Sequence, residues 1–444
     1  MESSAADQIG IYQNPVELCR NLIRFDTRNP PGNEAECISY ISDLLSRAGF
    51  EISVLYKSPD RPNLITRLKG TGDAPPLMMY GHVDVVTTAD QVWTHPPFEA
   101  KVADGFIWGR GALDMKSGVA MMLAAILRAK AERLAPVGDV VLVVLCDEEA
   151  GSEFGAKYLV ENHPKRFSDI RYAIGEFGGY TAHVGGKKFY PIQIAEKQVC
   201  WMKATVRGPA GHGARPMRGG AMSRAADLLR RLDRHRLPVH VTPVIRQMIE
   251  IFAANLPFPK GLIFRQLLNP HLTDFILNHL GEFSEYLDPL LHNTVNATII
   301  RGGDKVNVIP SEVTVALDGR LLPGYTPNDM LAELRQIIAK DVELEVTRHE
   351  PYPAEPDVGL FETLAGILQD ADPCAVAMPL LIPAVTDARI FARLGIQSYG
   401  FIPMKLPAGF NFFQTIHGAD ERIPAAAVQF GTQAIYELLK RYDG

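Results

Sequence analysis

Apolar residues follow two different spacings along the first part of the chain. Short apolar runs predict β-strands at 51–55, 62–68, 77–81, 139–146 and 172–175. Two of these runs, 77–81 and 139–146, are apolar at nearly every position, which is typical of strands buried on both faces of a parallel sheet. Between the strands, apolar residues recur every three or four positions and predict helices at 15–25, 33–49 and 117–130. Alternating strands and helices predict an α/β layered fold.

Two helix starts are marked by capping residues. Asn14 precedes a proline, and Glu17 follows three positions later, as in a reciprocal cap. Asn33 is followed by Glu36 in the same way, so we expect the second helix to begin at Asn33 and to end before Gly49.

The pattern changes after Glu196. Strands are predicted at 199–206, 294–300, 312–321 and 342–348, and helices at 221–232 and 327–340. With the segment 235–292 as an insertion, these elements form the β-α-β-β-α-β series of a ferredoxin-like unit. The alternating pattern resumes after this series. We therefore expect two domains, one built from residues 1–195 and 350–444 and the other from 196–349.

Composition narrows the class of protein. The chain has 444 residues, more than a single core usually supports, and its 47% hydrophobic and 22% charged content is that of a globular protein. A net charge of -6 favours neither nucleic acid nor an anionic membrane as a partner. The first seven residues lack the features of a signal peptide, so a cytoplasmic location is expected. The five cysteines are scattered without a C-x-x-C pair, which indicates reduced thiols.

Imidazole and carboxylate groups follow the predicted buried strands. His82 and Asp84 end the strand 77–81, and residues i and i+2 of an extended segment share one side, so Asp84 can orient His82 toward a metal. Asp114 lies in a glycine-rich loop before a helix. Glu148 and Glu149 follow the strand 139–146, and further members of this set are Glu176, after 172–175, and the late His417. The alternatives are a core histidine at 82, a helix cap at 114 and a surface loop at 147–149.

Together these groups can hold two divalent ions. Each ion would take one histidine and one terminal carboxylate, and one aspartate would bridge them. Glu148 then stays unligated and can accept a proton from an activated water and pass it to a leaving amine. This chemistry is amide hydrolysis.

The ordered motifs HVD, GRGALDMKSG, DEEAGSEFGA, GE, GPAGHGARP and TIHGADERI resemble the dinuclear zinc amidohydrolase and peptidase family. That family includes aminoacylase, carnosinase, acetylornithine deacetylase, succinyl-diaminopimelate desuccinylase and glutamate carboxypeptidase. The resemblance implies a zinc-peptidase-like catalytic domain, with a mixed, mostly parallel sheet between helices, and an inserted α+β dimerisation lid at 196–349. It also implies two Zn²⁺ per subunit, although Mn²⁺ or Co²⁺ would suit the same ligands.

Residue roles follow from the same resemblance. His82 and Glu176 would serve one zinc, Glu149 and His417 the other, and Asp114 would bridge. Asp84 would orient His82, and Glu148 would be the general base.

Three residues of the expected lid are assigned by the resemblance as well. His212 would cross into the partner subunit's active site and stabilise an oxyanion, so a homodimer is expected. Arg320 would pair with a substrate carboxylate, and Asn296 would lie near the scissile carbonyl. A loop histidine, a structural salt bridge and a strand-edge residue are the respective alternatives.

Two segments give no guidance on the substrate. Many relatives carry a glycine pair in the substrate loop, whereas residues 383–389 read PAVTDAR, which is bulkier and stiffer. The apolar insertion 235–292 either lines an acyl pocket or packs against its own domain. The expected activity is hydrolysis of an amide next to a free carboxylate, as an N-acyl amino acid amidohydrolase or a small-peptide carboxypeptidase. The alternatives are a dipeptidase, a carbamate or xenobiotic amide hydrolase, and a non-enzymatic ligand-binding relative, against which the presence of Glu148 argues.

Overall fold

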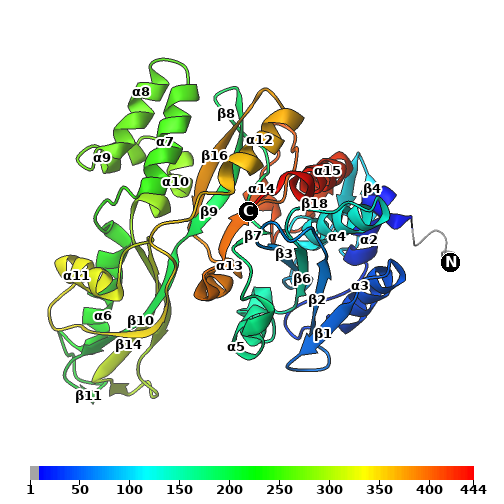
Figure 1. The fold of residues 1–444 in the computed structure, drawn as a ribbon. Coiled ribbons are helices and arrows are strands. Elements are labelled where there is room, and N and C mark those ends of the chain that lie inside the picture. The colour runs from blue at the N-terminus through cyan, green and yellow to red at the C-terminus, as the bar shows by residue number, and fades with distance from the viewer. Residues whose placement is uncertain (1–9) are drawn as a thin grey trace. The chain divides into compact units, whose positions relative to one another are not determined.

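A computed structural model describes residues 10–444 (Figure 1). The seven residues on which the prediction about a signal peptide rests lie outside the described residues. Contacts divide the chain into two compact units. Unit 1 comprises the chain up to Ile194, Asp357–Leu380 and Thr386–Gly444. Unit 2 comprises Ala195–Pro356 and Leu381–Val385.

Unit 1 is built on a nine-stranded sheet with the order β1-β2-β6-β3-β7-β17-β9-β16, and β8 pairs with β9. The strands are β1 (Ile52–Tyr56), β2 (Pro62–Leu68), β3 (Leu77–His82), β6 (Val140–Leu145), β7 (Tyr172–Gly175), β8 (Ala182–Val184), β9 (Lys187–Glu196), β16 (Ala375–Ile382) and β17 (Gln397–Gly400). The four neighbours β6, β3, β7 and β17 are parallel, while β1 and β2 are antiparallel to each other. Parallel neighbours end at the same edge, which places the segments after β3, β6 and β7 side by side.

Helices cover both faces of this sheet. Met78 and Tyr80 of β3 pack in one apolar cluster with Leu159 and Phe391, which lie on α5 (Ala156–Asn162) and α13 (Ala388–Phe391). On the opposite face, α4 (Lys116–Ala131) contacts β3 and packs against α2 (Pro15–Ile23) and α15 (Ala425–Arg441). Helix α4 is apolar and buried along most of its length because it lies between the sheet and these two helices.

Unit 1 also contains shorter elements. These are η1 (Ile11–Gln13), α3 (Ala35–Arg47), β4 (Lys101–Ala103), β5 (Phe106–Trp108), η2 (Glu148–Ala150), η3 (Pro164–Arg166), α12 (Phe361–Ala371), η5 (Ala392–Leu394), α14 (Phe412–Thr415) and β18 (Arg422–Pro424). Strands β18, β5 and β4 form a small separate sheet.

The start predicted for the second helix is wrong. Helix α3 begins at Ala35 and its N-cap position is Glu34, so Asn33 does not cap it. The Glu34 carboxylate is buried and accepts hydrogen bonds from Arg61 at 2.8 and 2.9 Å. This buried ion pair fixes the chain at the helix start.

Unit 2 contains a four-stranded antiparallel sheet with the order β12-β14-β10-β15. Its elements are β10 (Gln198–Arg207), α6 (Ala221–Arg234), β12 (Thr294–Arg301), β14 (Glu312–Leu321), α11 (Pro327–Ile337) and β15 (Glu343–Glu350). This is the β-α-β-β-α-β order expected from the sequence. Both helices pack on one face of the sheet, where buried residues such as Met202, Val315, Leu228 and Leu334 form a common core. Two short strands, β11 (Gly211–His212) and β13 (Val308–Ile309), form a separate antiparallel pair. Strand β11 follows β10 in the sequence, and β13 precedes β14.

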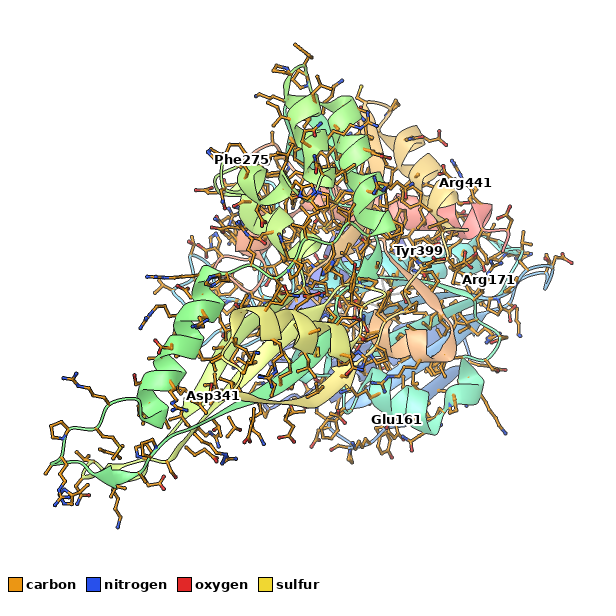
Figure 2. The ribbon with its side chains drawn as sticks, turned by 90° about the vertical axis from the view of Figure 1, so that its left-hand side faces the viewer. Glu161, Arg171, Phe275, Asp341, Tyr399 and Arg441 are labelled. Carbon is orange, nitrogen blue, oxygen red and sulfur yellow. The ribbon has the colours of Figure 1, made fainter. Side chains whose placement is uncertain are left out.

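The inserted segment of unit 2 is helical. It comprises α7 (Pro243–Asn255), α8 (Lys260–Arg265), η4 (Gln266–Leu268), α9 (Thr273–Leu277) and α10 (Phe283–Leu291). Phe252, Phe264 and Phe283 form its aromatic core, with ring centroids 5.6 and 6.1 Å apart along the series. Phe275 of α9, labelled in Figure 2, is 65% exposed. Among the described residues, no helix combines the length and the apolar character needed to span a bilayer.

Candidate metal centre

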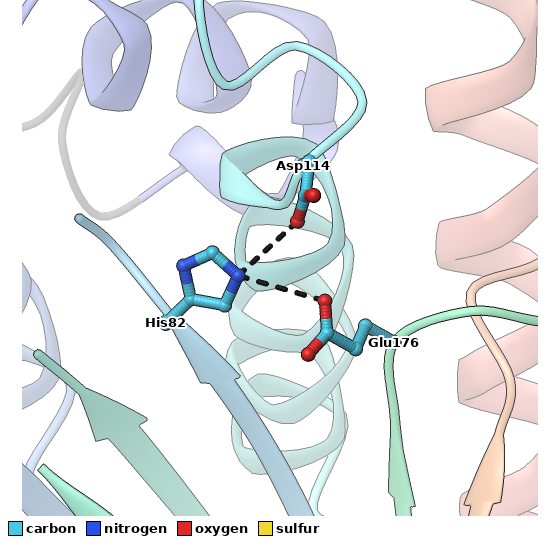
Figure 3. A group of neighbouring side chains, drawn as sticks. All are labelled: His82, Asp114 and Glu176. Carbon is cyan, nitrogen blue, oxygen red and sulfur yellow. Dashed lines mark hydrogen bonds and ion pairs between the residues drawn. The ribbon is translucent and has the colours of Figure 1, made fainter. Parts of the chain in front are cut away.

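The first group of candidate ligands lies at the edge where the parallel strands end. His82 is the last residue of β3, Glu176 follows β7, and Asp114 lies in the loop before α4. His82 Nε2 is 3.1 Å from Asp114 Oδ1 and 3.6 Å from Glu176 Oε2 (Figure 3). All three side chains are buried, and their ligand atoms lie within 4.8 Å of one another. This spacing suits one divalent ion.

The second group shares Asp114 with the first. His417 Nε2 is 3.1 Å from Asp114 Oδ2 and 3.3 Å from Glu149 Oε1, and the three ligand atoms again lie within 4.8 Å. The two oxygens of Asp114 therefore face different histidines, His82 and His417. Asp114 and His417 lie 303 positions apart in the sequence. One carboxylate with its oxygens divided in this way has the geometry of a bridge.

Asp84 supports both groups from behind. Its carboxylate accepts backbone hydrogen bonds from Glu148 and Glu149, each at 3.1 Å, so it holds the segment that carries the candidate base. His82 Nδ1 lies 3.0 Å from the Asp84 backbone oxygen and 3.5 Å from its Oδ1. A hydrogen bond at Nδ1 fixes the ring so that Nε2 points toward the candidate ion.

Sequence reasoning missed a buried network behind Asp84. The Asn29 side-chain amide donates to Asp84 Oδ2 at 2.9 Å and to Asp147 Oδ1 at 3.0 Å. Arg61 binds the same Asp147 oxygen at 3.0 Å while it holds Glu34. Asp147, the first of three adjacent acids, is thus neutralised by a protein cation. The three adjacent acids at 147–149 indicated that cations must lie nearby, but no sequence pattern identified Arg61 as one of them.

A second missed pair joins the Asp114 loop to the His417 loop. The buried carboxylate of Glu421 accepts backbone hydrogen bonds from Gly111, Leu113 and Asp114 and a 2.6 Å ion pair from Arg110. Arg110 also donates to the His417 backbone oxygen at 3.1 Å. Arg110 lies in the motif GRGALDMKSG and Glu421 in the motif TIHGADERI. Membership of these motifs was the only sequence feature that could have drawn attention to them.

Charges within the site shift the pKa values of its acids. Burial, followed by the charge of Glu176, raises the pKa of Glu148 well above its usual range. Burial also raises the pKa of Glu149, and it raises that of Glu176 to about 8. Asp114 departs from this trend: burial alone would raise its pKa, but hydrogen bonds from His417 and His82 hold it below the ordinary value.

The pKa values of both histidines are raised, which is the opposite of what burial alone would do. The hydrogen bond to Asp114 and the nearby carboxylate of Glu149 raise the pKa of His417 to about 10. Burial alone would lower the pKa of His82, but its bonds to the surrounding carboxylates raise it. The carboxylates around both imidazoles therefore favour positive charge in this site.

The donor set fits divalent ions. It consists of imidazole nitrogens and carboxylate oxygens without a thiolate, a combination that suits Zn²⁺ and also Mn²⁺ or Co²⁺. The buried Glu149 Oε1 has no hydrogen-bond partner, although it lies within ion-pair distance of His417. Glu148 belongs to neither group of ligands.

The other predicted site residues lie in unit 2. His212 is exposed on β11, and its Nδ1 accepts a hydrogen bond from the Ala214 backbone at 3.1 Å. Arg320 is paired with Asp318 at 2.8 and 3.1 Å, as in a structural salt bridge. Asn296 is exposed on β12, opposite Asp318 in register. Their roles stay predictions.

The loop 383–389, whose sequence differs from that of many relatives, contributes a further carboxylate to unit 1. Asp387 is buried, and its Oδ1 accepts a hydrogen bond from Ser152 at 2.5 Å, while its Oδ2 has no hydrogen-bond partner. Its charge contributes to the raised pKa of both Glu148 and Glu176. Asp387 was quoted in the sequence only as part of the loop, without a role.

Residues 78–441 match the model of peptidase family M20/M25/M40. The chain belongs to this family. The family resemblance inferred from the motifs is thereby confirmed, and this M20 protein is a metallohydrolase with an α/β fold whose mixed central sheet has parallel strands, β6, β3, β7 and β17, at its centre.

Individual relatives are distant. The N-fatty-acyl-amino acid synthase/hydrolase of Mus musculus is 26% identical over 382 residues, which cover 83% of this chain and 74% of that protein. An M20 family metallo-carboxypeptidase from Sulfolobus solfataricus has a similar fold, with a TM-score of 0.66 and 16% identity over 97% of this chain and 99% of that one. A dinuclear metal-binding M20 peptidase from Bacillus subtilis gives a TM-score of 0.61 and 13% identity, with 97% and 98% covered.

Proposed function

We propose that this M20 protein hydrolyses the amide bond of N-acyl amino acids, releasing an amino acid whose carboxylate adjoins that bond. The observation that carries the proposal is Asp114, whose two oxygens face two histidines that each have a further carboxylate beside them. The name of the mouse relative, an N-fatty-acyl-amino acid synthase/hydrolase, supports this substrate class.

His82 and Glu176 would hold one ion, Glu149 and His417 the other, and Asp114 both. When bound, two such ions lower the pKa of a water molecule and polarise the scissile carbonyl. Zn²⁺ is the ion that this donor set favours.

Glu148 is the proposed general base. It belongs to neither ligand group, and its backbone is held by Asp84 at 3.1 Å. Burial and the nearby Glu176 raise its pKa, which moves the carboxylate toward the range in which a group can accept a proton and return it. Glu148 would take a proton from the attacking water and deliver it to the leaving amine.

Residues of unit 2 complete the proposal. Arg320 would exchange its Asp318 partner for the carboxylate of the substrate, a bidentate match that guanidinium groups favour. Asn296 would contact the scissile carbonyl, and His212 of one subunit would stabilise the oxyanion in the other. Strand β12 supports a homodimer: it is an edge strand of its sheet, and Ile299 and Ile300 on it are 52% and 54% exposed.

The first test separates metal binding from catalysis. Glu148→Ala should retain the metal content of the wild type and lose hydrolysis of N-acyl amino acids by two to four orders of magnitude, roughly the contribution of a general base. The exposed Glu99→Ala is a matched control and should retain full activity. Unchanged turnover by Glu148→Ala would contradict the mechanism. A screen in which only dipeptides or non-natural amides are cleaved would contradict the substrate class alone.

The second test concerns His212. His212→Ala should bind metal normally and be nearly inactive. Mixed dimers of His212→Ala and Glu148→Ala subunits should regain part of the activity, because one of the two sites then has both residues intact. A mixture that exchanges subunits and stays inactive would exclude the role across subunits.

A further inference from the structure

Helix α8 carries apolar side chains on its outer side. Gly261 and Phe264 are buried on the inner side, where the Phe264 ring lies 5.6 Å from that of Phe252. On the opposite side, Leu262 and Ile263 are 57% and 52% exposed. A helix on a water-facing surface normally has polar residues there. The outer side of α8 therefore has the composition of a contact surface.

The apolar exposure continues before the helix. Phe258, two positions before α8, is 84% exposed, an unusually large value for an aromatic side chain. Together with Leu262 it lines a groove of about 410 Å³ that also includes Ala253 and Leu256. Figure 1 shows α8 beside α7 within this helical group.

Two cations flank these apolar residues. Lys260 and Arg265 are the first and last residues of α8, both are exposed, and neither forms an ion pair within residues 10–444. The stretch 251–273 contains no aspartate or glutamate. Among the described residues that line the groove, Glu250 on α7 is the one acid. A locally basic segment thus occurs in a chain whose net charge is -6.

We propose that Phe258, Leu262 and Ile263, with Lys260 and Arg265, form a surface, called here the α8 surface, that docks on an anionic lipid bilayer. The three apolar side chains enter the boundary between headgroups and acyl chains, and the two cations remain among the anionic headgroups. The charge of the segment favours this occupant. A second copy of the chain is disfavoured, because a stable protein interface needs about 800 Å² per partner, more than one six-residue helix and its preceding turn provide.

Docking of this kind would bring the enzyme to substrates that partition into membranes. It does not depend on which amide the enzyme cleaves, because the α8 surface contains none of the residues assigned to the metal centre. Binding to lipid and hydrolysis can therefore be measured and refuted separately.

The test is flotation of the full chain with vesicles of phosphatidylcholine, prepared with and without phosphatidylserine. The wild type should float with the phosphatidylserine vesicles, and high salt should weaken the binding. Lys260→Glu combined with Arg265→Glu should lower the partition coefficient by more than about 25-fold, since each basic residue near such a surface contributes about fivefold. Phe258→Ser combined with Ile263→Ser should lower it by at least about tenfold, the loss expected for one large apolar side chain.

Tyr56→Ser is the matched control, because Tyr56 of β1 is also an exposed aromatic residue, at 53%. It should bind vesicles like the wild type, and every variant should retain hydrolysis of a water-soluble amide, which reports an intact fold. Wild-type protein that does not float would overturn the proposal, as would equal binding by the variants. Self-association of the wild type that Phe258→Ser with Ile263→Ser abolishes, without vesicle binding, would assign the surface to a second copy instead.

Discussion

Asn29 offers a sharp test of the network behind the metal centre. Asn29→Ala removes two hydrogen bonds to buried carboxylates, one to Asp84 at 2.9 Å and one to Asp147 at 3.0 Å. Hydrogen bonds to charged groups contribute about 1.5–3 kcal/mol each, so the loss of stability should be about 3 kcal/mol or more. Because Asp84 holds the backbone of Glu148 and Glu149, metal affinity should fall about 10- to 100-fold as well.

Asn293→Ala is a matched control. Asn293 is also buried, and its amide donates two hydrogen bonds at 3.1 Å to the buried Glu333 carboxylate of unit 2. Its substitution should cost a similar amount of stability without altering metal affinity. Urea unfolding measures the first quantity, and zinc competition with a chromophoric chelator measures the second. If Asn29→Ala loses stability but binds zinc as tightly as Asn293→Ala does, Asn29 stabilises the fold and does not position the centre.

Four further outcomes are expected. Metal affinity, measured by chelator competition across pH, should weaken by about tenfold per pH unit per displaced proton as the pH falls, because His417, with a pKa of about 10 in the metal-free protein, must lose its proton to bind an ion. In that metal-free protein, the stability from protonated His417 is present below the unfolded pKa of about 6.5 and should be lost as the pH rises through about 10, as urea unfolding would show. Glu421→Ala, which removes the acceptor of three backbone N–H groups, should lower metal affinity about 10- to 100-fold in the same competition assay, and unaltered affinity would refute its positioning role. Leu142→Ala, in the centre of β6, should cost about 2–5 kcal/mol in thermal unfolding with little change in the metal content of the folded protein.

The sequence predicted elements whose pattern is dictated by burial. Strand β3 and strand β6 are apolar throughout because both faces are covered, and the sequence located both to within one residue at either end. His82, Glu149 and Glu176 were found at or after predicted buried strands, whereas Asp114 and His417 were found through the ordered motifs. The capping rule predicted the wrong helix start at Asn33. The N-cap position is the neighbouring Glu34, whose carboxylate is bound by Arg61, a residue distant in the sequence.

The supporting residues of the site could not be predicted for a related reason. Asn29 and Arg61 act on Asp84 and Asp147 through contacts that span 55 and 86 positions. No periodicity or short motif records such pairings, since they arise only when the layers pack. Local patterns and the ordered motifs therefore indicated the candidate ligands, whereas the residues that hold those ligands in place could not be predicted.

The order of the proposed ligands along the chain has a consequence for biosynthesis. The other four proposed ligands emerge from the ribosome long before His417, and strand β18 and helix α15, which anchor the segment after His417 on β5, α2 and α4, follow later still. Until then the nascent protein carries a cluster of acids without one of its two imidazoles or the Glu421 brace. Metal loading at the proposed pair of sites should therefore follow synthesis of the segment that carries His417 and Glu421, and truncation before His417 should yield a protein that cannot hold both ions.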